Sequence, residues 1–125
     1  MDPIQLSENI QLYIQDANKH VSQQKYTMIY FDPPFNSKRN YTLFVNSSVG
    51  FTDKWMDDEY FNFIKTMIDK LYDMLEKKGT LFFHISSSCM FIPELILRQK
   101  FKFVEPIFWK KCRSKNNVKN KLGST

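Results

Sequence analysis

The chain has 125 residues, 42% of them hydrophobic and 25% charged, and its formal net charge is +5. This length suits one small domain or a piece of one, the composition excludes a disordered chain, and the lack of a leader-like start or a long apolar run predicts a cytoplasmic protein outside the membrane. Cys89 and Cys112 show no CxxC spacing and no matching histidine pair, which excludes structural zinc and a disulfide framework, so no metal is expected.

The first half of the chain predicts short elements. Residues Ile10 to Ile14 alternate weakly and suggest a strand, followed by a short polar helix or turn through Ala17 to Ser22. Tyr26 to Phe31 is a continuous β-branched and aromatic run that ends at two prolines, as a buried parallel strand does. Asn36 to Gly50 is polar and irregular and predicts a long loop.

The second half has a stronger helical pattern. From Asp57 onward, apolar residues recur at helical spacing up to a predicted end at Gly79: Tyr60, Ile64, Met67, Ile68, Leu71 and Leu75. A second buried strand is predicted over Thr80 to Ile85, a helix over Met90 to Lys100 and a third strand over Phe101 to Trp109. Strands that alternate with helices indicate an α/β architecture with a mainly parallel sheet flanked by helices.

The predicted strand that ends at Phe31 leads directly into Asp32, Pro33, Pro34 and Phe35, at the edge where open α/β sheets bind ligands. The prolines fix φ and remove two backbone donors, so rigid carbonyls remain as acceptors. An enzyme that methylates an exocyclic amino group must hold its two N–H donors, and Asp32 with the Pro33 carbonyl fits that task, while Phe35 offers a stacking face for a flipped base. The alternative is a turn that only ends a strand.

A wider pattern accompanies this motif. Tyr30 to Asn36, then Phe51 to Trp55, then Gly79 to Ile85, then Trp109 with two lysines follow in the order typical of amino-methylating DNA methyltransferases of restriction-modification systems. The chain resembles their branch in which the catalytic motif precedes the cofactor motif. The resemblance implies part of a Rossmann-like fold that uses S-adenosyl-L-methionine, with residues 1–125 as the catalytic portion of a methyltransferase domain.

The resemblance also implies roles for single residues. Asp at the first motif position is similar to the adenine-N6 enzymes, whereas cytosine-N4 enzymes usually have Ser there. The resemblance implies cofactor contacts at Asp16 and Asp32, although Asp16 could equally cap a helix. His84 stands where the family often shows His-x-Asp, but Ser86 departs from that pattern, so a structural role is expected for His84. Trp55 is expected to anchor a loop or pack in the core.

The C-terminal segment 109–125 is basic. Six cationic residues occur between positions 110 and 121 without an acidic residue, which is compatible with a polyanionic partner or with a solvated tail. Phosphate contacts to DNA are the hypothesis for Lys110, Lys111 and Arg113.

Glycine is scarce, and the only three positions are Gly50, Gly79 and Gly123. The family binds its cofactor with a glycine-rich turn that here would lie beyond residue 125, together with central strands of the sheet. We therefore expect an incomplete fold that needs a complementary C-terminal half and is inactive alone. The alternatives are an inactive remnant or DNA-binding subunit, and, less favoured, an RNA guanine-N2 methylase.

Overall fold

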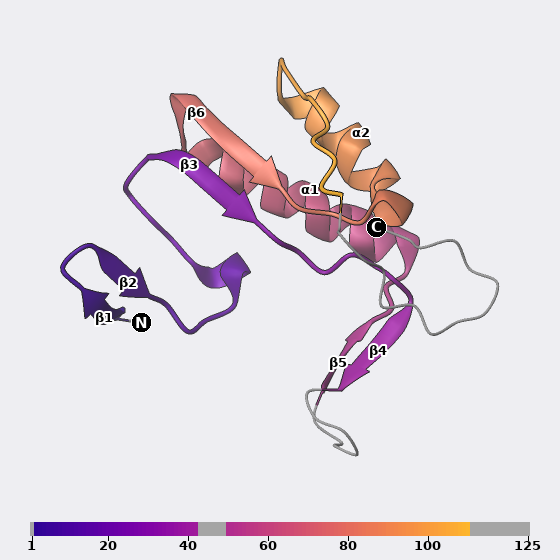
Figure 1. Cartoon of the computed structure of the whole chain (residues 1–125), viewed down its shortest axis with the longest axis horizontal. Coiled ribbons are helices and arrows are strands. Elements are labelled where there is room, and N and C mark those ends of the chain that lie inside the picture. The colour runs from indigo at the N-terminus through magenta and orange to yellow at the C-terminus, as the bar shows by residue number, and fades with distance from the viewer. Residues whose placement is uncertain (1, 43–49, 111–125) are drawn as a thin grey trace.

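A computed structural model describes residues 2–42 and 50–110 of the chain (Figure 1). In chain order the strands and α-helices are β1 (Ile4–Ser7), β2 (Ile10–Leu12), β3 (Tyr26–Phe31), β4 (Arg39–Thr42), β5 (Gly50–Asp53), α1 (Asp57–Met74), β6 (Leu75–Phe83) and α2 (Phe91–Lys100), with 3₁₀ turns at Ala17–Lys19 and Ser87–Cys89. None of the helices in the described ranges is long and apolar enough to span a membrane.

The centre of the fold is a parallel pair of strands. β3 and β6 lie side by side with Tyr30 opposite Phe82 and Phe31 opposite Phe83, and α1 connects them as a crossover helix. The predicted strand Tyr26–Phe31 is confirmed at both ends. Because parallel neighbours need such a crossover, this unit confirms the predicted α/β class.

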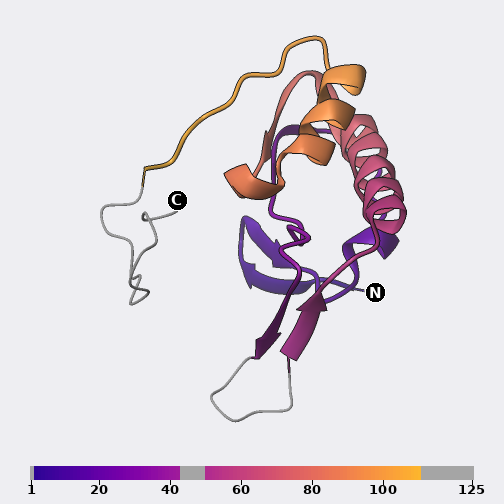
Figure 2. The same ribbon diagram turned by 90° about the vertical axis from the view of Figure 1, so that its right-hand side faces the viewer.

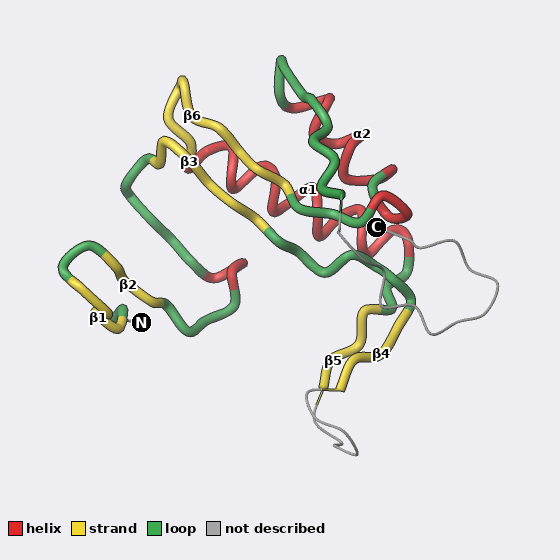
Figure 3. Tube along the Cα trace, viewed as in Figure 1, coloured by secondary structure: helices red, strands yellow, loops and turns green. Residues whose placement is uncertain are grey.

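The helices cover one face of this sheet, and α1 runs behind the strands in Figures 1 and 3. The core lies under α1 and α2, where Tyr60, Ile64, Ile68 and Ile96 form a buried cluster that contacts Phe83 of β6. On the other face Met28, Tyr30 and Phe82 are 61%, 59% and 41% exposed. Within the described ranges, the helices that flank the sheet therefore lie on one of its faces.

Helix α1 ends earlier than its sequence pattern predicts. Acidic residues in its first turn stabilise the start of the helix by interacting with the positive end of the helix dipole. The helix ends at Met74, and the next residue, Leu75, belongs to β6 and pairs with Tyr26. Gly79 does not have the positive φ of a helix-capping glycine. Its missing side chain instead allows the Tyr26 carbonyl to approach closely, since a Cβ there would lie 3.0 Å from that oxygen.

Two antiparallel ribbons stand outside the parallel pair. β1 and β2 form one of them, so the strand expected over Ile10 to Ile14 is shorter and has a partner that the sequence did not suggest. The loop predicted from Asn36 to Gly50 was wrong at Arg39–Thr42 and at Gly50, because β4 and β5 pair from Arg39 opposite Asp53 to Thr42 opposite Gly50. Residues 43–49 of that prediction lie outside the described residues. Arg39 and Asn40 of β4 and Thr52 of β5 are exposed polar residues, so this part of the second ribbon has no apolar face from which a strand could be predicted.

The third strand predicted over Phe101 to Trp109 is absent from the structure, while the preceding helix is confirmed as α2. After Phe101 the chain runs away from α2 without joining a sheet (Figure 2). Phe103, Ile107, Phe108 and Trp109 are each more than 70% exposed. High β propensity predicts a strand only when the segment pairs with a neighbouring edge, and residues 101–109 pair with none of the described strands.

The substitution Gly79→Ala tests the close approach in the middle of β6. The added Cβ would lie 2.9 Å from a Leu75 methyl carbon and 3.0 Å from two backbone oxygens, and the backbone cannot easily move away. We expect a loss of about 1–3 kcal/mol in the free energy of unfolding, measured by urea denaturation. The exposed neighbour change Lys78→Ala should stay within about 0.5 kcal/mol of wild type. Equal stability of Gly79→Ala and wild type would contradict this packing.

Candidate active site

The motif Asp32 to Phe35 lies where β3 ends, at the carboxyl edge of the parallel pair. Asp32 is exposed, Pro33 is buried and Phe35 is half-buried. An acceptor carboxylate therefore faces solvent, next to a rigid backbone and an aromatic ring. This is the edge at which the sequence predicted a ligand site.

His84 holds the neighbouring strand end against this motif. Its backbone N–H donates to the Phe31 carbonyl at 2.9 Å, and its Nδ1 hydrogen-bonds the Tyr30 hydroxyl. The imidazole lies beside the ring of Phe35, with centroids 5.7 Å apart and the planes tilted by 33°. The structural role expected for His84 at the strand end is confirmed.

The carbonyl of Pro34 is already occupied. The hydroxyl of Tyr60, on the first turns of α1, donates to it at 2.9 Å. Tyr60 is 1% exposed, and burial raises the pKa of its phenol, so this donor keeps its proton. The expectation of unpaired carbonyls beside the prolines was thus wrong for Pro34. The Pro33 carbonyl, which the sequence analysis named as an acceptor for the amino group of a base, stays a candidate.

Asp53, the last residue of β5, binds the backbone that follows the motif. Its carboxylate accepts hydrogen bonds from the Asn36 N–H at 2.9 Å, the Ser37 N–H at 2.8 Å and the Ser37 hydroxyl at 2.7 Å. Its carbonyl accepts from the Lys38 N–H at 2.8 Å. Asp53 is only 2% exposed. Burial alone raises the pKa of this carboxyl, but the hydrogen bonds from Ser37 and Asn36 outweigh it and hold the pKa below the ordinary value.

The segment Asn36 to Lys38, which we call the 36–38 turn, has an unusual backbone. Asn36 and Lys38 have φ values of 60° and 62°, in the left-handed region that non-glycine residues seldom adopt. The Asn36 side-chain oxygen accepts a hydrogen bond from the backbone N–H of Trp55 at 3.0 Å. Trp55 itself stacks on Phe63 with centroids 4.9 Å apart, which confirms its expected role in anchoring a loop.

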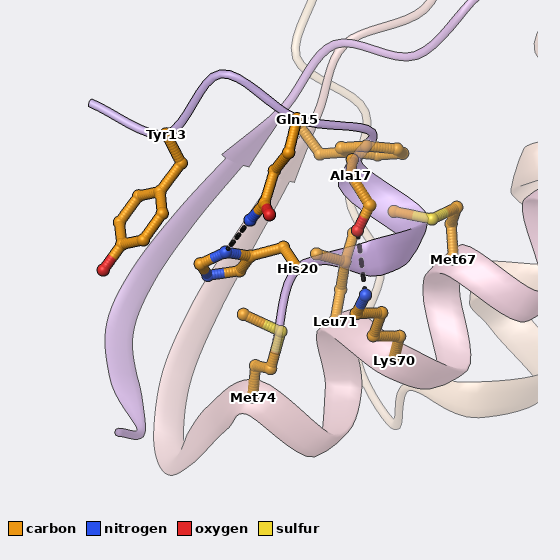
Figure 4. A pocket seen from close by; sticks show the side chains of 9 residues that line it. Tyr13, Gln15, Ala17, His20, Met67, Lys70, Leu71 and Met74 are labelled. Carbon is orange, nitrogen blue, oxygen red and sulfur yellow. Dashed lines mark hydrogen bonds between the residues drawn. The ribbon is translucent and has the colours of Figure 1, made fainter. Parts of the chain in front are cut away.

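A cavity of about 270 Å³ lies between the N-terminal segment, Phe31 and α1 (Figure 4), and none of the four motif residues lines it. Two hydrogen bonds support its wall, from Lys70 to the Ala17 carbonyl and between Gln15 and His20, both at 2.8 Å. The lining comprises Tyr13, Gln15, Ala17, His20, Phe31, Met67, Lys70, Leu71 and Met74. Asp16 is not among these residues, because its carboxylate caps the 3₁₀ turn by accepting from the Asn18 N–H at 2.9 Å.

The basic segment reaches the site at its start. The ring of Trp109 lies 6.2 Å from that of His84, centroid to centroid, and Lys110 follows it as an exposed residue. Lys111 and Arg113 fall outside the described residues. In the part of the chain that the structure covers, no group of three or more His, Cys, Asp or Glu side chains is arranged to hold a metal ion.

The parallel strand pair and its crossover helix are compatible with part of an α/β methyltransferase domain, and comparison with known proteins gives the family. The family model described as DNA methylase, of the N6/N4 type, matches residues 26–125. The chain therefore belongs to the DNA methylase family. It is also similar to the Type II methyltransferase M.EcaI of Enterobacter cloacae, with 25% identity over 107 residues, which cover 83% of this chain and 24% of that relative. No solved structure matches the chain.

The sequence pointed to Asp32 and Phe35 as candidate site residues but not to the hydrogen bonds around Phe35. Asp53 was noticed only as part of a family segment, and Tyr60 only as an apolar position of a helix. One signal in the sequence could have drawn attention to Asp53. It is an acidic residue that lies between Thr52 and Trp55, shortly before the predicted helix that begins at Asp57. Nothing in the sequence says that its partners lie 16 and 17 residues earlier.

The lowered pKa of Asp53 predicts how stability depends on pH. A lowered folded-state pKa means that ionised Asp53 stabilises the fold above its unfolded pKa of about 3.9, and this contribution is lost as pH falls through the folded pKa. Wild type should exceed Asp53→Asn by about 2 kcal/mol in free energy of unfolding at pH 7, and the difference should shrink below pH 4. Asp69, whose pKa is also lowered by Lys65 and Lys100, is present in both proteins and cancels in the comparison. A difference that does not change with pH would contradict the assignment.

Proposed function

We propose that the chain is the catalytic part of a site-specific DNA methyltransferase of the restriction-modification kind, which transfers a methyl group from S-adenosyl-L-methionine to the N6 amino group of adenine. The observation that carries this proposal is the exposed Asp32 carboxylate at the end of a parallel strand, beside buried Pro33 and the ring of Phe35. Asp at this motif position favours adenine over cytosine as the methylated base.

The residues of the motif have separable tasks in this proposal. Asp32 accepts one N–H of the exocyclic amino group and stabilises the positive charge that develops on the nitrogen. The Pro33 carbonyl accepts the second N–H, and Phe35 stacks on a base that has been flipped from the duplex. The nitrogen lone pair is thereby held in one direction, so the rate gain comes from orientation and electrostatics.

The residues present fit only part of the cofactor. When bound, S-adenosyl-L-methionine supplies an electrophilic methyl group on a sulfonium. The cavity beside Phe31 has apolar walls from Met67 and Leu71 that suit a flat ring, but its 270 Å³ lies below the roughly 300–1,000 Å³ of sites for whole small molecules. Asp32 stands next to this cavity in the chain. A cofactor contact from Asp16 would require its carboxylate to leave the Asn18 N–H.

The nucleic-acid partner of the proposal is DNA. Lys110 is exposed and follows Trp109, which lies beside His84 at the edge of the motif. A cation there can contact a backbone phosphate while a base occupies the site. We assign the same role to Lys111 and Arg113 within the basic segment 109–125.

Activity in this proposal needs a complementary part. The chain spans about a quarter of the length of the curated relative that it matches. No two glycines lie close together in the sequence, so a glycine-rich cofactor turn must come from elsewhere. We propose that a C-terminal half, in the same chain or in a second one, supplies this turn. We also propose that the assembled enzyme acts on DNA in the cytoplasm.

A second candidate function is an inactive remnant or a DNA-binding subunit. The same lack of a glycine-rich turn favours it, because the basic segment could serve DNA binding without any cofactor. The two functions differ in one observable property, which is the transfer of a labelled methyl group by the complete reading frame.

The substitution Asp32→Ala tests the proposal. In the complete reading frame that contains this chain, with labelled S-adenosyl-L-methionine and unmethylated DNA, we expect wild type to form N6-methyladenine and Asp32→Ala to lose at least about 100-fold in kcat. DNA affinity should change by less than about 3-fold, because base contacts add little to phosphate binding. The exposed carboxylate change Asp73→Ala, near the far end of α1, is the matched control and should keep full activity.

Nucleoside analysis of the product decides between the outcomes. N4-methylcytosine would overturn the assignment to adenine, and retained transfer by Asp32→Ala would overturn the role of the motif. No transfer by wild type, together with DNA binding that weakens as salt rises, would support the remnant instead.

A further inference from the structure

We propose that Asp53 and Tyr60 are positioning residues for methyl transfer, which hold the Asp32 to Phe35 segment by its backbone from its far side. This inference rests on the proposed function for its catalytic consequence, while its geometric part stands on the hydrogen bonds of the described residues. Neither side chain is assigned contact with the substrate. Their contacts all lie with the backbone and with Ser37, between residues 34 and 38.

The two prolines of the motif leave one backbone torsion free, and Tyr60 is placed to restrain it. The rings of Pro33 and Pro34 fix φ at both residues, and a proline at position 34 also restricts ψ of Pro33. The ψ angle of Pro34 is the soft torsion that remains, and it sets the direction of Phe35. The hydrogen bond from the Tyr60 hydroxyl to the Pro34 carbonyl, at 2.9 Å, restrains this torsion. Tyr60 is itself fixed, because it is 1% exposed within the helical core.

Asp53 restrains the other side of Phe35. Its two carboxylate oxygens accept from the N–H groups of Asn36 and Ser37, so Phe35 lies between one anchored carbonyl and one anchored amide. All the groups that face the Asp53 carboxylate from the 36–38 turn are donors. An asparagine would direct its own N–H groups toward some of these donors, so the uncharged isostere cannot replace the carboxylate.

The backbone of the 36–38 turn explains why such an anchor is needed. Asn36 and Lys38 both adopt positive φ, which costs free energy for residues with a Cβ and persists only when neighbours hold it. Asp53 contributes through its side chain and through its carbonyl, which accepts from Lys38. Without the carboxylate, the turn is expected to relax and to release Phe35 from its place beside His84.

The experiment compares Asp53→Asn and Tyr60→Phe with wild type in the complete reading frame. Both variants keep the size of the side chain, and circular dichroism establishes that they are folded at the assay temperature. The matched control is Thr52→Ala, which removes an exposed hydroxyl that donates to Asn40 on the same ribbon. Amide exchange of residues 35–38 is measured together with kcat and KM for DNA.

For Asp53→Asn we expect amide exchange at Asn36 and Ser37 to rise by at least about 10-fold. We expect kcat to fall about 100-fold, with KM for DNA within about 3-fold of wild type. For Tyr60→Phe, amide exchange at Asn36 and Ser37 should stay within about 3-fold of wild type while kcat falls about 10-fold. A residue that only supported stability would lower the melting temperature and leave kcat of the folded protein unchanged. Thr52→Ala should match wild type in all three quantities.

Unchanged exchange at Asn36 and Ser37 in Asp53→Asn would overturn the anchor, and unchanged kcat in folded Asp53→Asn and Tyr60→Phe would overturn the positioning role. A wild type that transfers no methyl group is a failure of the proposed function. In that case the exchange data alone decide whether Asp53 holds the turn.

Discussion

A single buried carboxylate organises the surroundings of the motif. Asp53 sits 2% exposed at the end of β5 and accepts three hydrogen bonds from the turn that follows Phe35. A buried charge is stable only when it is paired or fully hydrogen-bonded, so the turn must take the one conformation that supplies these donors. The Asp53 carbonyl also accepts from the Lys38 N–H, one residue before β4 begins, so the side chain and the backbone of Asp53 both bind the turn. The local fold and the candidate site therefore depend on the same ionised group.

The parallel strand pair is covered by helices on one of its two faces. Helices α1 and α2 bury the core beneath β3 and β6, whereas Met28, Tyr30 and Phe82 remain exposed on the opposite face. Parallel sheets usually have both faces covered, because crossover connections place helices on them. Exposure of this face is in keeping with our proposal that a complementary part completes the domain. The cavity beside Phe31, which fits only part of the cofactor, points the same way.

The sequence predicted those elements whose pattern arises from burial. The β3 strand and the α2 helix are apolar where they meet the core, and their residues were identified nearly to the ends. The loop predicted over 36–50 was wrong at Arg39–Thr42 and Gly50, because Arg39, Asn40 and Thr52 are exposed polar residues that give no apolar strand pattern. The strand predicted over Phe101 to Trp109 was wrong because β propensity alone does not say whether a segment pairs with an edge. In the candidate site, the motif pointed to Asp32 and Phe35, whose roles stay predictions. Asp53 and Tyr60 could not be predicted, since their roles come from hydrogen bonds across 16 to 26 residues that no local pattern contains.

The most direct test of this account is an NMR titration that follows the amide protons of Asn36 and Ser37 from pH 7 to pH 2. If the Asp53 carboxylate accepts from both groups, their signals should lie downfield at neutral pH and move together as pH falls, with one shared midpoint below the ordinary aspartate pKa of about 3.9. In Asp53→Asn this shared transition should be missing. Amide signals in wild type that do not titrate, or that titrate with different midpoints, would contradict the claim that Asp53 anchors the turn.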